Sequence, residues 1–323
     1  MESPIFIFSL PRSGSTLLQR VLASHDDIAT AAEPWILLPY LYTLKKQGVY
    51  TEYGHYLLTD ALQDFCAEMP NGVDDYLFEM RTFMMNLYSK ASEKDTRYFL
   101  DKTPRYHLIA EDVMRLFPDA KFILLQRNPL AIIASIIETW GGKKWNLFRY
   151  KVDLYDGMRN LVNLHARFSD QLIILKYEAL ISNPEIEISR ICDALNIEYN
   201  SSLIDSFSNV KLKGRSGDPT GQKKYNSLSD EPVEKWKSVI NNPWRKWWCR
   251  RYLNWLGDKR LESIGYSLDE LLSELNAVPT VLKGMFTDLF IAIYGVFYCA
   301  LEPNILRDKA RKLPKWKWIR KHD

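Results

Sequence analysis

Residues 5–22 constrain the fold most, because they place three distinct local patterns in direct succession. Residues 5–8 form a short apolar run that is typical of a strand buried in a parallel sheet. Small, turn-forming residues follow, and apolar side chains in residues 17–22 then recur at helical spacing. The first amides of such a helix lack intrahelical acceptors, and the helix dipole attracts negative charge. The segment therefore predicts a strand, a turn and a helix that together cradle a phosphate.

The predicted turn differs from the phosphate loop of nucleotidases in its cation. In the pattern G-x-x-x-x-G-K-[ST], Ser9 takes the first glycine position, Gly14 the second, and Ser15 the position of the lysine. A kinase or GTPase needs that lysine and a metal ion on its β- and γ-phosphates. Here the cation is Arg12, inside the loop. The loop suits an anion that need not be a Mg-bound triphosphate, and a metal-dependent P-loop kinase stays open as an alternative.

The rest of the chain predicts an α/β protein. With 323 residues, of which 46% are hydrophobic, it can bury a large core in one or two domains. The net charge of +3 is too small to indicate nucleic-acid binding by itself. Apolar runs alternating with helical segments predict a P-loop-like, three-layer fold: a central, mainly parallel sheet of four or five strands with helices on both faces. We expect this domain to span residues 1–275, and residues 276–323 to form an apolar helix and a basic tail.

The cysteines and the N-terminus indicate a cytoplasmic protein. Cys66, Cys192, Cys249 and Cys299 are far apart and form no C-x-x-C pair, which is typical of reduced thiols. Glu2 precedes the first apolar run, where a secretory signal would carry Lys or Arg, so we expect no signal peptide. No stretch reaches about 18 uncharged apolar residues, and we expect no membrane-spanning helix.

Three further charged residues are predicted at the carboxyl edge of the sheet. The first helix carries the chain roughly 15 Å away, and an extended return along residues 25–35 brings Glu33 back. Lys102 and Arg127 each come at the end of a short segment that is predicted to be a buried strand. Ligands of open α/β sheets bind at this edge. Glu33 is therefore either an acid–base residue or a surface carboxylate before Pro34.

Together these motifs resemble those of sulfotransferases that use 3′-phosphoadenosine 5′-phosphosulfate (PAPS). Residues 11–16 (Pro-Arg-Ser-Gly-Ser-Thr) match the 5′-phosphosulfate loop of that family. Residues 102–104 (Lys-Thr-Pro) match its lysine segment, and residues 127–129 (Arg-Asn-Pro) with Ser135 match its 3′-phosphate motif. The pattern is most similar to tyrosylprotein-type and bacterial small-molecule sulfotransferases, and it extends over roughly residues 4–270.

The resemblance implies a role for each matched residue, with PAPS as donor, adenosine 3′,5′-bisphosphate as product and no metal. Lys102 would offset charge on the bridging oxygen, and Arg12 would take part in catalysis as well as binding. The residues implied at the 5′-phosphosulfate are Arg12, Ser13, Gly14, Ser15 and Thr16. Those implied on the 3′-phosphate and adenosine side are Arg127, Ser135, Tyr177, Lys213, Gly214 and Arg215. Tyr177 is equally compatible with a place in the core.

Glu33 is the general base that the resemblance implies, since a glutamate after the first strand–helix unit has this role in tyrosylprotein-type enzymes. The sequence departs from other members of the family at the usual histidine position, which is Pro104, and His107 does not match. In the loop that follows residue 210, Leu212 and Pro219 replace the Arg and Trp of the family pattern.

Aromatic and basic segments elsewhere leave the acceptor and further partners open. Residues 35–90 are rich in aromatics that either cover an acceptor pocket or pack in the core. Residues 231–275 carry five tryptophans, which predict an amphipathic helix rather than a site for single-stranded nucleic acid. Residues 285–323 predict a helix that packs, contacts a second copy or lies on a membrane surface. We expect a small-molecule acceptor from secondary metabolism with a hydroxyl or amine. A non-enzymatic membrane or nucleic-acid adaptor is the alternative.

Overall fold

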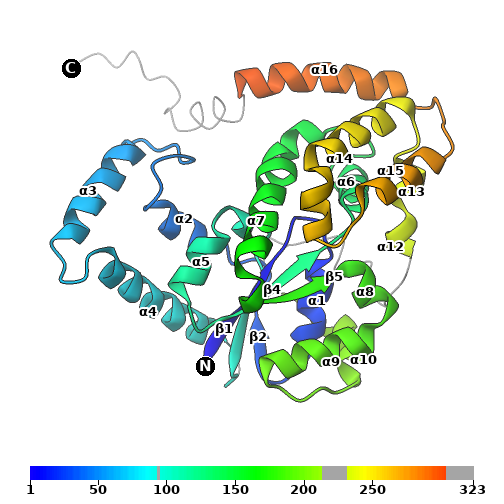
Figure 1. Ribbon diagram of the computed structural model, residues 1–323. Helices are drawn as coiled ribbons and strands as arrows, with labels where there is room; N and C mark the ends of the chain where they lie inside the picture. The colour runs from blue at the N-terminus through cyan, green and yellow to red at the C-terminus, as the bar shows by residue number, and fades with distance from the viewer. Residues whose placement is uncertain (93–94, 213–230, 303–323) are drawn as a thin grey trace, which may run out of the picture.

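A five-stranded parallel sheet lies at the centre of the molecule (Figure 1). The computed structural model describes residues 1–92, 95–212 and 231–302. In these residues the strand order is β2-β3-β1-β4-β5, and all four strand pairs are parallel. The strands are β1 (Ser3–Phe8), β2 (Ile28–Thr30), β3 (Tyr98–Asp101), β4 (Lys121–Gln126) and β5 (Leu172–Lys176). The predicted α/β fold with a mainly parallel sheet is confirmed.

The alternation of side chains along the strands creates two separate cores. In β1, Phe6 and Phe8 belong to one apolar cluster, whereas Ile5 and Ile7 belong to the other. Every second residue of a strand points to the same face, so both faces of this sheet need a covering layer.

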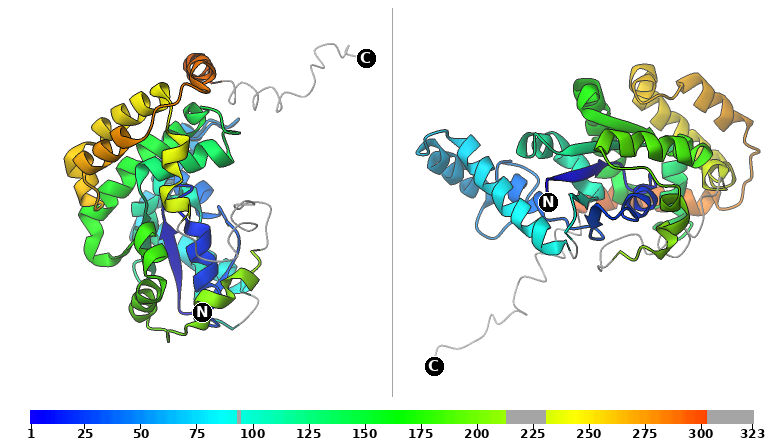
Figure 2. Two further views of the ribbon diagram at one scale, coloured as in Figure 1. Left: turned by 90° about the vertical axis from the view of Figure 1, so that its right-hand side faces the viewer. Right: turned by 90° about the horizontal axis from the view of Figure 1, so that it is seen from below.

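Helices supply both layers, which gives the predicted three-layer arrangement (Figure 2). The helices with residues in the cluster of Ile5 and Ile7 are α1 (Ser15–Leu22), α8 (Tyr177–Ser182), α9 (Pro184–Leu195) and α10 (Ser202–Ser206). Those in the cluster of Phe6 and Phe8 include α4 (Val73–Ala91), α5 (Ala110–Leu116), α6 (Pro129–Thr139), α7 (Met158–Phe168), α14 (Pro243–Ser263) and α15 (Leu268–Ala277).

Two short helices, α2 (Leu37–Tyr42) and α13 (Trp236–Val239), add residues to the cluster of Phe6 and Phe8. The helices α3 (His55–Ala67), α12 (Glu231–Glu234) and α16 (Met285–Leu301) contribute no described buried residue to either cluster. With α4, the helices α2 and α3 form the arm on the left of Figure 1. Several of the arm's large aromatics are exposed, including Tyr53, Phe65 and Phe78. Within the described residues, no helix combines the length and the hydropathy needed to cross a bilayer.

The strand order makes β1 the point where the chain changes direction across the sheet. β1 pairs with β3 on one side and β4 on the other, and the chain visits β2 and β3 before it crosses to β4 and β5. At such a switch point the loops after neighbouring strands diverge and leave a crevice at the carboxyl edge. The predicted extended return of residues 25–35 forms β2 in part, which places Glu33 at this edge.

Candidate active site

The loop between β1 and α1 forms a tight cradle at the crevice. Arg12 and Gly14 both have positive φ angles, 70° and 93°, and α1 begins directly after Gly14. A Cβ atom on Gly14 would lie 2.3 Å from the ring of Tyr177, so a side chain cannot replace this glycine without displacing the tyrosine. The amides of the first helical turn have no intrahelical acceptor and face an anion favourably.

Two guanidinium groups are tied to this loop. The Arg12 side chain donates to Ser135 Oγ and Thr139 Oγ1, each at 3.2 Å, and lies over the ring of Trp140. The Arg127 Nη1 atom donates to the carbonyl oxygen of Arg12 at 2.8 Å, and its guanidinium lies 4.2 Å from the centre of the Tyr177 ring. The loop and the start of α6 thus carry positive charge on one side of the cradle.

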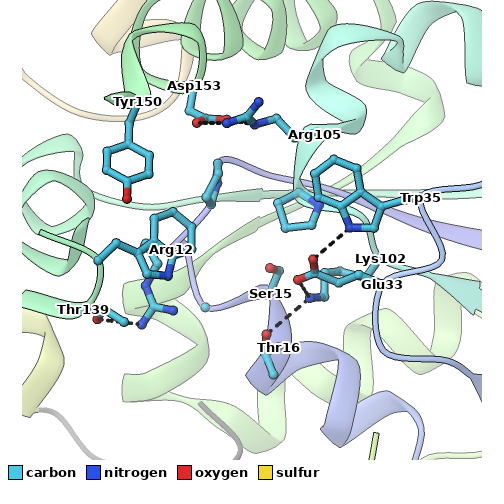
Figure 3. A pocket seen from close by; sticks show the side chains of 14 residues that line it. Arg12, Ser15, Thr16, Glu33, Trp35, Lys102, Arg105, Thr139, Tyr150 and Asp153 are labelled. Atoms are coloured by element: carbon cyan, nitrogen blue, oxygen red, sulfur yellow. Dashed lines mark hydrogen bonds and ion pairs between the residues drawn. The ribbon is translucent and has the colours of Figure 1, made fainter. Parts of the chain in front are cut away.

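Lys102 connects the cradle to Glu33. The Lys102 Nζ atom lies 2.8 Å from Glu33 Oε1 and 3.3 Å from Thr16 Oγ1, in the first turn of α1 (Figure 3). The lysine side chain is 1% exposed and the glutamate side chain 11% exposed. The Trp35 indole donates to the other carboxylate oxygen of Glu33 at 3.2 Å. Since a carboxylate offers about four lone-pair sites, Glu33 can still accept a proton from a third partner.

The buried carboxylate of Asp101 helps to hold the segment that carries Glu33 in place. Asp101 Oδ2 accepts hydrogen bonds from Tyr88 and Tyr106 at 2.7 and 2.9 Å, and Thr103 donates to Oδ1 at 3.1 Å. Thr103 Oγ1 in turn accepts from the Trp35 amide at 3.2 Å. Complete burial raises the pKa of Asp101 to about 6, and the three hydroxyl donors oppose this shift. The network fixes the segment that carries Glu33 and Trp35.

These groups open onto a cavity of about 570 Å³. Arg105 and Asp153 form another part of its wall, and Arg105 donates to Asp153 Oδ2 at 2.9 Å. Behind this wall, His107 Nε2 lies 2.9 Å from Asp153 Oδ1. Asp153 belongs to a π-helical turn, η3 (Val152–Gly157), a local irregularity that often occurs at functional sites. The side chains of Trp35, Trp140 and Tyr150 add aromatic surface to the wall (Figure 3).

Six residues predicted for the site meet at this one cavity: Arg12, Gly14, Ser15, Thr16, Glu33 and Lys102. Three others lie next to the loop rather than on the cavity wall, because Ser135 and Arg127 bond to Arg12 and Tyr177 packs on Gly14. Ser13 is buried and lines a small hollow that Arg127 also lines. Lys213, Gly214 and Arg215 lie outside the described residues. His107 is buried behind Asp153 and does not line the cavity.

Several wall residues were not assigned individual roles, and Trp35 was predicted only as one of the aromatics of residues 35–90 that cover an acceptor pocket or pack in the core. Trp35 has a φ of 60°, an uncommon backbone conformation for a bulky residue, and its indole orients Glu33. Its position two residues after Glu33 and directly after Pro34 was a usable signal. Arg105 follows the Lys-Thr-Pro segment closely, but Thr139, Tyr150 and Asp153 carry no local motif. Their role depends on how α6 and η3 pack. In the described part of the chain, no group of three or more His, Cys, Asp or Glu residues has metal-binding geometry.

Comparisons with known proteins identify the family of this chain. A model of the sulfotransferase family matches residues 4–201. Nodulation protein NoeE of Sinorhizobium fredii is 28% identical over 265 residues, covering 75% of this chain and 59% of NoeE. A putative protein-tyrosine sulfotransferase of Caenorhabditis briggsae is 28% identical over 213 residues, covering 63% of this chain and 69% of that protein.

The fold is similar to that of a solved sulfotransferase domain from the curacin biosynthetic pathway. The TM-score is 0.53 and the identity 24%, over 74% of this chain and 92% of that domain. The chain thus spans about three fifths of NoeE and most of the solved curacin-pathway domain. The family model covers more than half of the chain and includes the cradle, Glu33, Lys102 and Arg127. This chain belongs to the sulfotransferase family.

Proposed function

We propose that this chain transfers the sulfuryl group of PAPS to a hydroxyl or amine of a small-molecule acceptor. The observation that carries the proposal is the position of Lys102, whose ammonium group joins Thr16 of the anion cradle to the Glu33 carboxylate. A cation between an anion site and a base fits a reaction in which negative charge builds up on the leaving oxygen while the acceptor loses a proton.

Each group has a place in the reaction. The acceptor oxygen or nitrogen attacks sulfur from the cavity, and the bond between sulfur and the bridging phosphate oxygen breaks. Adenosine 3′,5′-bisphosphate leaves with the bonding electron pair, and Lys102 and the cradle amides stabilise its charge. The acceptor proton passes to Glu33, which Trp35 and Lys102 hold at the cavity wall. Arg127 and Ser135 would bind the 3′-phosphate, with Tyr177 beside the nucleotide.

The cavity favours a small acceptor. Its volume of about 570 Å³ is in the range of sites for drug-sized molecules, and three aromatic side chains line it. Relatives named for nodulation and for curacin biosynthesis are consistent with a natural-product acceptor. The four cysteines are unpaired in the structure, as expected for the cytoplasmic location that we predict.

The reaction should need no metal, since Arg12 and Lys102 supply the positive charge at the site. We expect adenosine 3′,5′-bisphosphate to bind in EDTA, and transfer from PAPS to a panel of phenols, sugars and amines to be unchanged by EDTA. Activity that required Mg²⁺, or binding of Mg·ATP in preference to PAPS, would instead support a P-loop kinase.

Lys102→Met provides the matched test of the site. Loss of a preorganised charge at the developing anion should lower turnover by about 10²–10³-fold. Lys246→Met is the control, because Lys246 is also buried but donates to the carbonyl oxygens of Val278 and Asn276, away from the cavity. Equal turnover losses per folded molecule in the two variants would contradict the proposed role of Lys102.

A further inference from the structure

Helix α16 packs on the molecule with its polar and small residues, and its large apolar residues face outward. Its buried positions are Asp288 and Gly295, whereas Phe286, Phe290 and Val296 are 77%, 74% and 69% exposed. Helices of globular proteins normally bury the apolar side and expose the charged one. An outward face of this kind is typical of a surface that meets an apolar partner.

Specific contacts fix this orientation. Asp288 accepts hydrogen bonds from Arg245 at 2.7 and 3.2 Å and from Asn242 at 2.8 Å. Gly295 packs so closely on Phe148 that a Cβ atom there would lie 2.6 Å from the ring. If α16 rotated to bury its phenylalanines, Asp288 would become exposed or lose its hydrogen-bond partners. A side chain larger than that of Gly295 would then press against Phe148. The helix therefore lies along the outside of the molecule with a defined outward side (Figures 1 and 2).

An aromatic groove of about 710 Å³ continues this surface between α14 and α16. Trp244, Trp247 and Trp248 line it from α14, and two exposed cations, Lys151 and Arg251, lie at its wall. None of the described lining residues is Asp or Glu. Tryptophan and basic residues beside an apolar surface are the composition of membrane–water interfaces.

The charge around α16 distinguishes a lipid surface from a second copy of the chain. Lys283 precedes the helix and is exposed, and the exposed Lys151 and Arg251 lie at the wall of the groove. A twofold contact between copies uses the same patch on both, so these cations would face one another. An anionic bilayer would instead attract them, by about 1 kcal/mol for each basic residue near the surface.

We propose that α16 and the groove beside it dock this protein on an anionic lipid bilayer. The helix lies flat in the headgroup region, with the side that carries Phe290 and Phe297 turned to the acyl chains and Lys151 and Arg251 near the headgroups. Its 17 residues extend over roughly 26 Å along the surface of the protein on which the helix packs. This docking is independent of the chemistry proposed above. The domain boundary that the sequence predicts at residue 275, on the N-terminal side of α16, stays a prediction.

Co-sedimentation of the full chain with vesicles tests the proposal. We expect binding to vesicles of phosphatidylcholine and phosphatidylglycerol to exceed binding to phosphatidylcholine alone at least about tenfold, and to weaken as NaCl rises. Replacing both Phe290 and Phe297 by Glu should reduce binding roughly tenfold or more. Phe65→Glu is the matched control, since Phe65 is 62% exposed on α3 and lies far from α16 in the chain; it should bind normally.

Three results would overturn the proposal: no vesicle binding, equal loss of binding in Phe65→Glu, or a dimer in lipid-free light scattering that the α16 substitutions dissociate. The last result would assign the face to a second copy. Thermal unfolding of each variant checks its fold. Val296→Glu, at a 69% exposed position, repeats the test if the double variant is unstable.

Discussion

The cavity at the sheet edge and the groove beneath α16 are hollows of similar size and opposite chemistry. The cavity, of about 570 Å³, holds Arg12, Glu33 and Lys102, whereas the groove, of about 710 Å³, is mainly aromatic and aliphatic. In the cavity, strand ends and the start of α1 bring opposite charges within 3 Å of each other. Beside the groove, the Asp288 carboxylate pairs with Arg245 on the buried side of α16, away from solvent.

One segment connects the two hollows. In the short helix η2 (Leu147–Tyr150), Phe148 lines the groove and packs on Gly295, whereas Tyr150 lines the cavity. The volume of a hollow in this molecule therefore does not show whether it is a reaction site. Convergent, hydrogen-bonded charges at the switch point of the sheet distinguish a site for reaction from a site for docking.

The largest effect that we expect comes from Glu33→Gln. Glutamine keeps the shape of glutamate but accepts a proton poorly, so turnover should fall by about 10²–10⁴-fold, the range for acid–base catalysis. Calorimetry with adenosine 3′,5′-bisphosphate should show nearly unchanged binding, and vesicle binding should stay normal. Normal turnover would refute the role of Glu33, and a loss of nucleotide binding as well would make Glu33 a structural carboxylate.

The pH dependence of stability tests the network below the cavity. Asp101 has a pKa of about 6 in the folded chain against an ordinary value of 3.8, so between these values the folded state holds a proton that the unfolded state has lost. Lowering the pH from 7 to 4 should therefore stabilise the native protein relative to Asp101→Asn, by about 2 kcal/mol.

Urea unfolding at several pH values measures this difference. Asp119→Asn is the control, because the Asp119 side chain is 91% exposed and its removal should give a nearly pH-independent difference. A native protein that lost stability relative to Asp101→Asn over the same interval would show that Asp101 is held ionised. Asp101 would then be an ionised carboxylate stabilised by its partners, as Glu33 is beside Lys102 in the cavity.

A smaller effect should separate the two guanidinium groups that lie over aromatic rings. Arg127→Ala should weaken binding of adenosine 3′,5′-bisphosphate on the order of tenfold more than binding of adenosine 5′-phosphate, because a charged donor to the 3′-phosphate is lost. Arg20→Ala is the matched control, since Arg20 is equally buried and lies over Phe207, away from the cavity. Equal weakening of both nucleotides by Arg127→Ala would indicate a structural role.

Local sequence determined the sheet, the cradle and the ends of strands where Glu33, Lys102 and Arg127 lie. Apolar runs followed at once by charged residues are local patterns, and the rule that parallel strands present their carboxyl ends at one edge places those residues together without knowledge of the packing. The start of α6 also rests on local residue types, because Pro129 takes its first position and Asn128 caps it.

Tertiary structure alone decided three further features. Asp153 reaches the cavity through the packing of a π-helical turn, and the backbone of Trp35 is held beside Glu33 by a hydrogen bond to Thr103, which is distant in the chain. The outward face of α16 is the third, because a run of uncharged residues has the same appearance whether it is buried or exposed. Its side is fixed by the hydrogen bonds that Asp288 accepts from Arg245 and Asn242, and by the close fit of Gly295 against Phe148. Such pairings join residues far apart in the chain, and sequence periodicity carries no information about them.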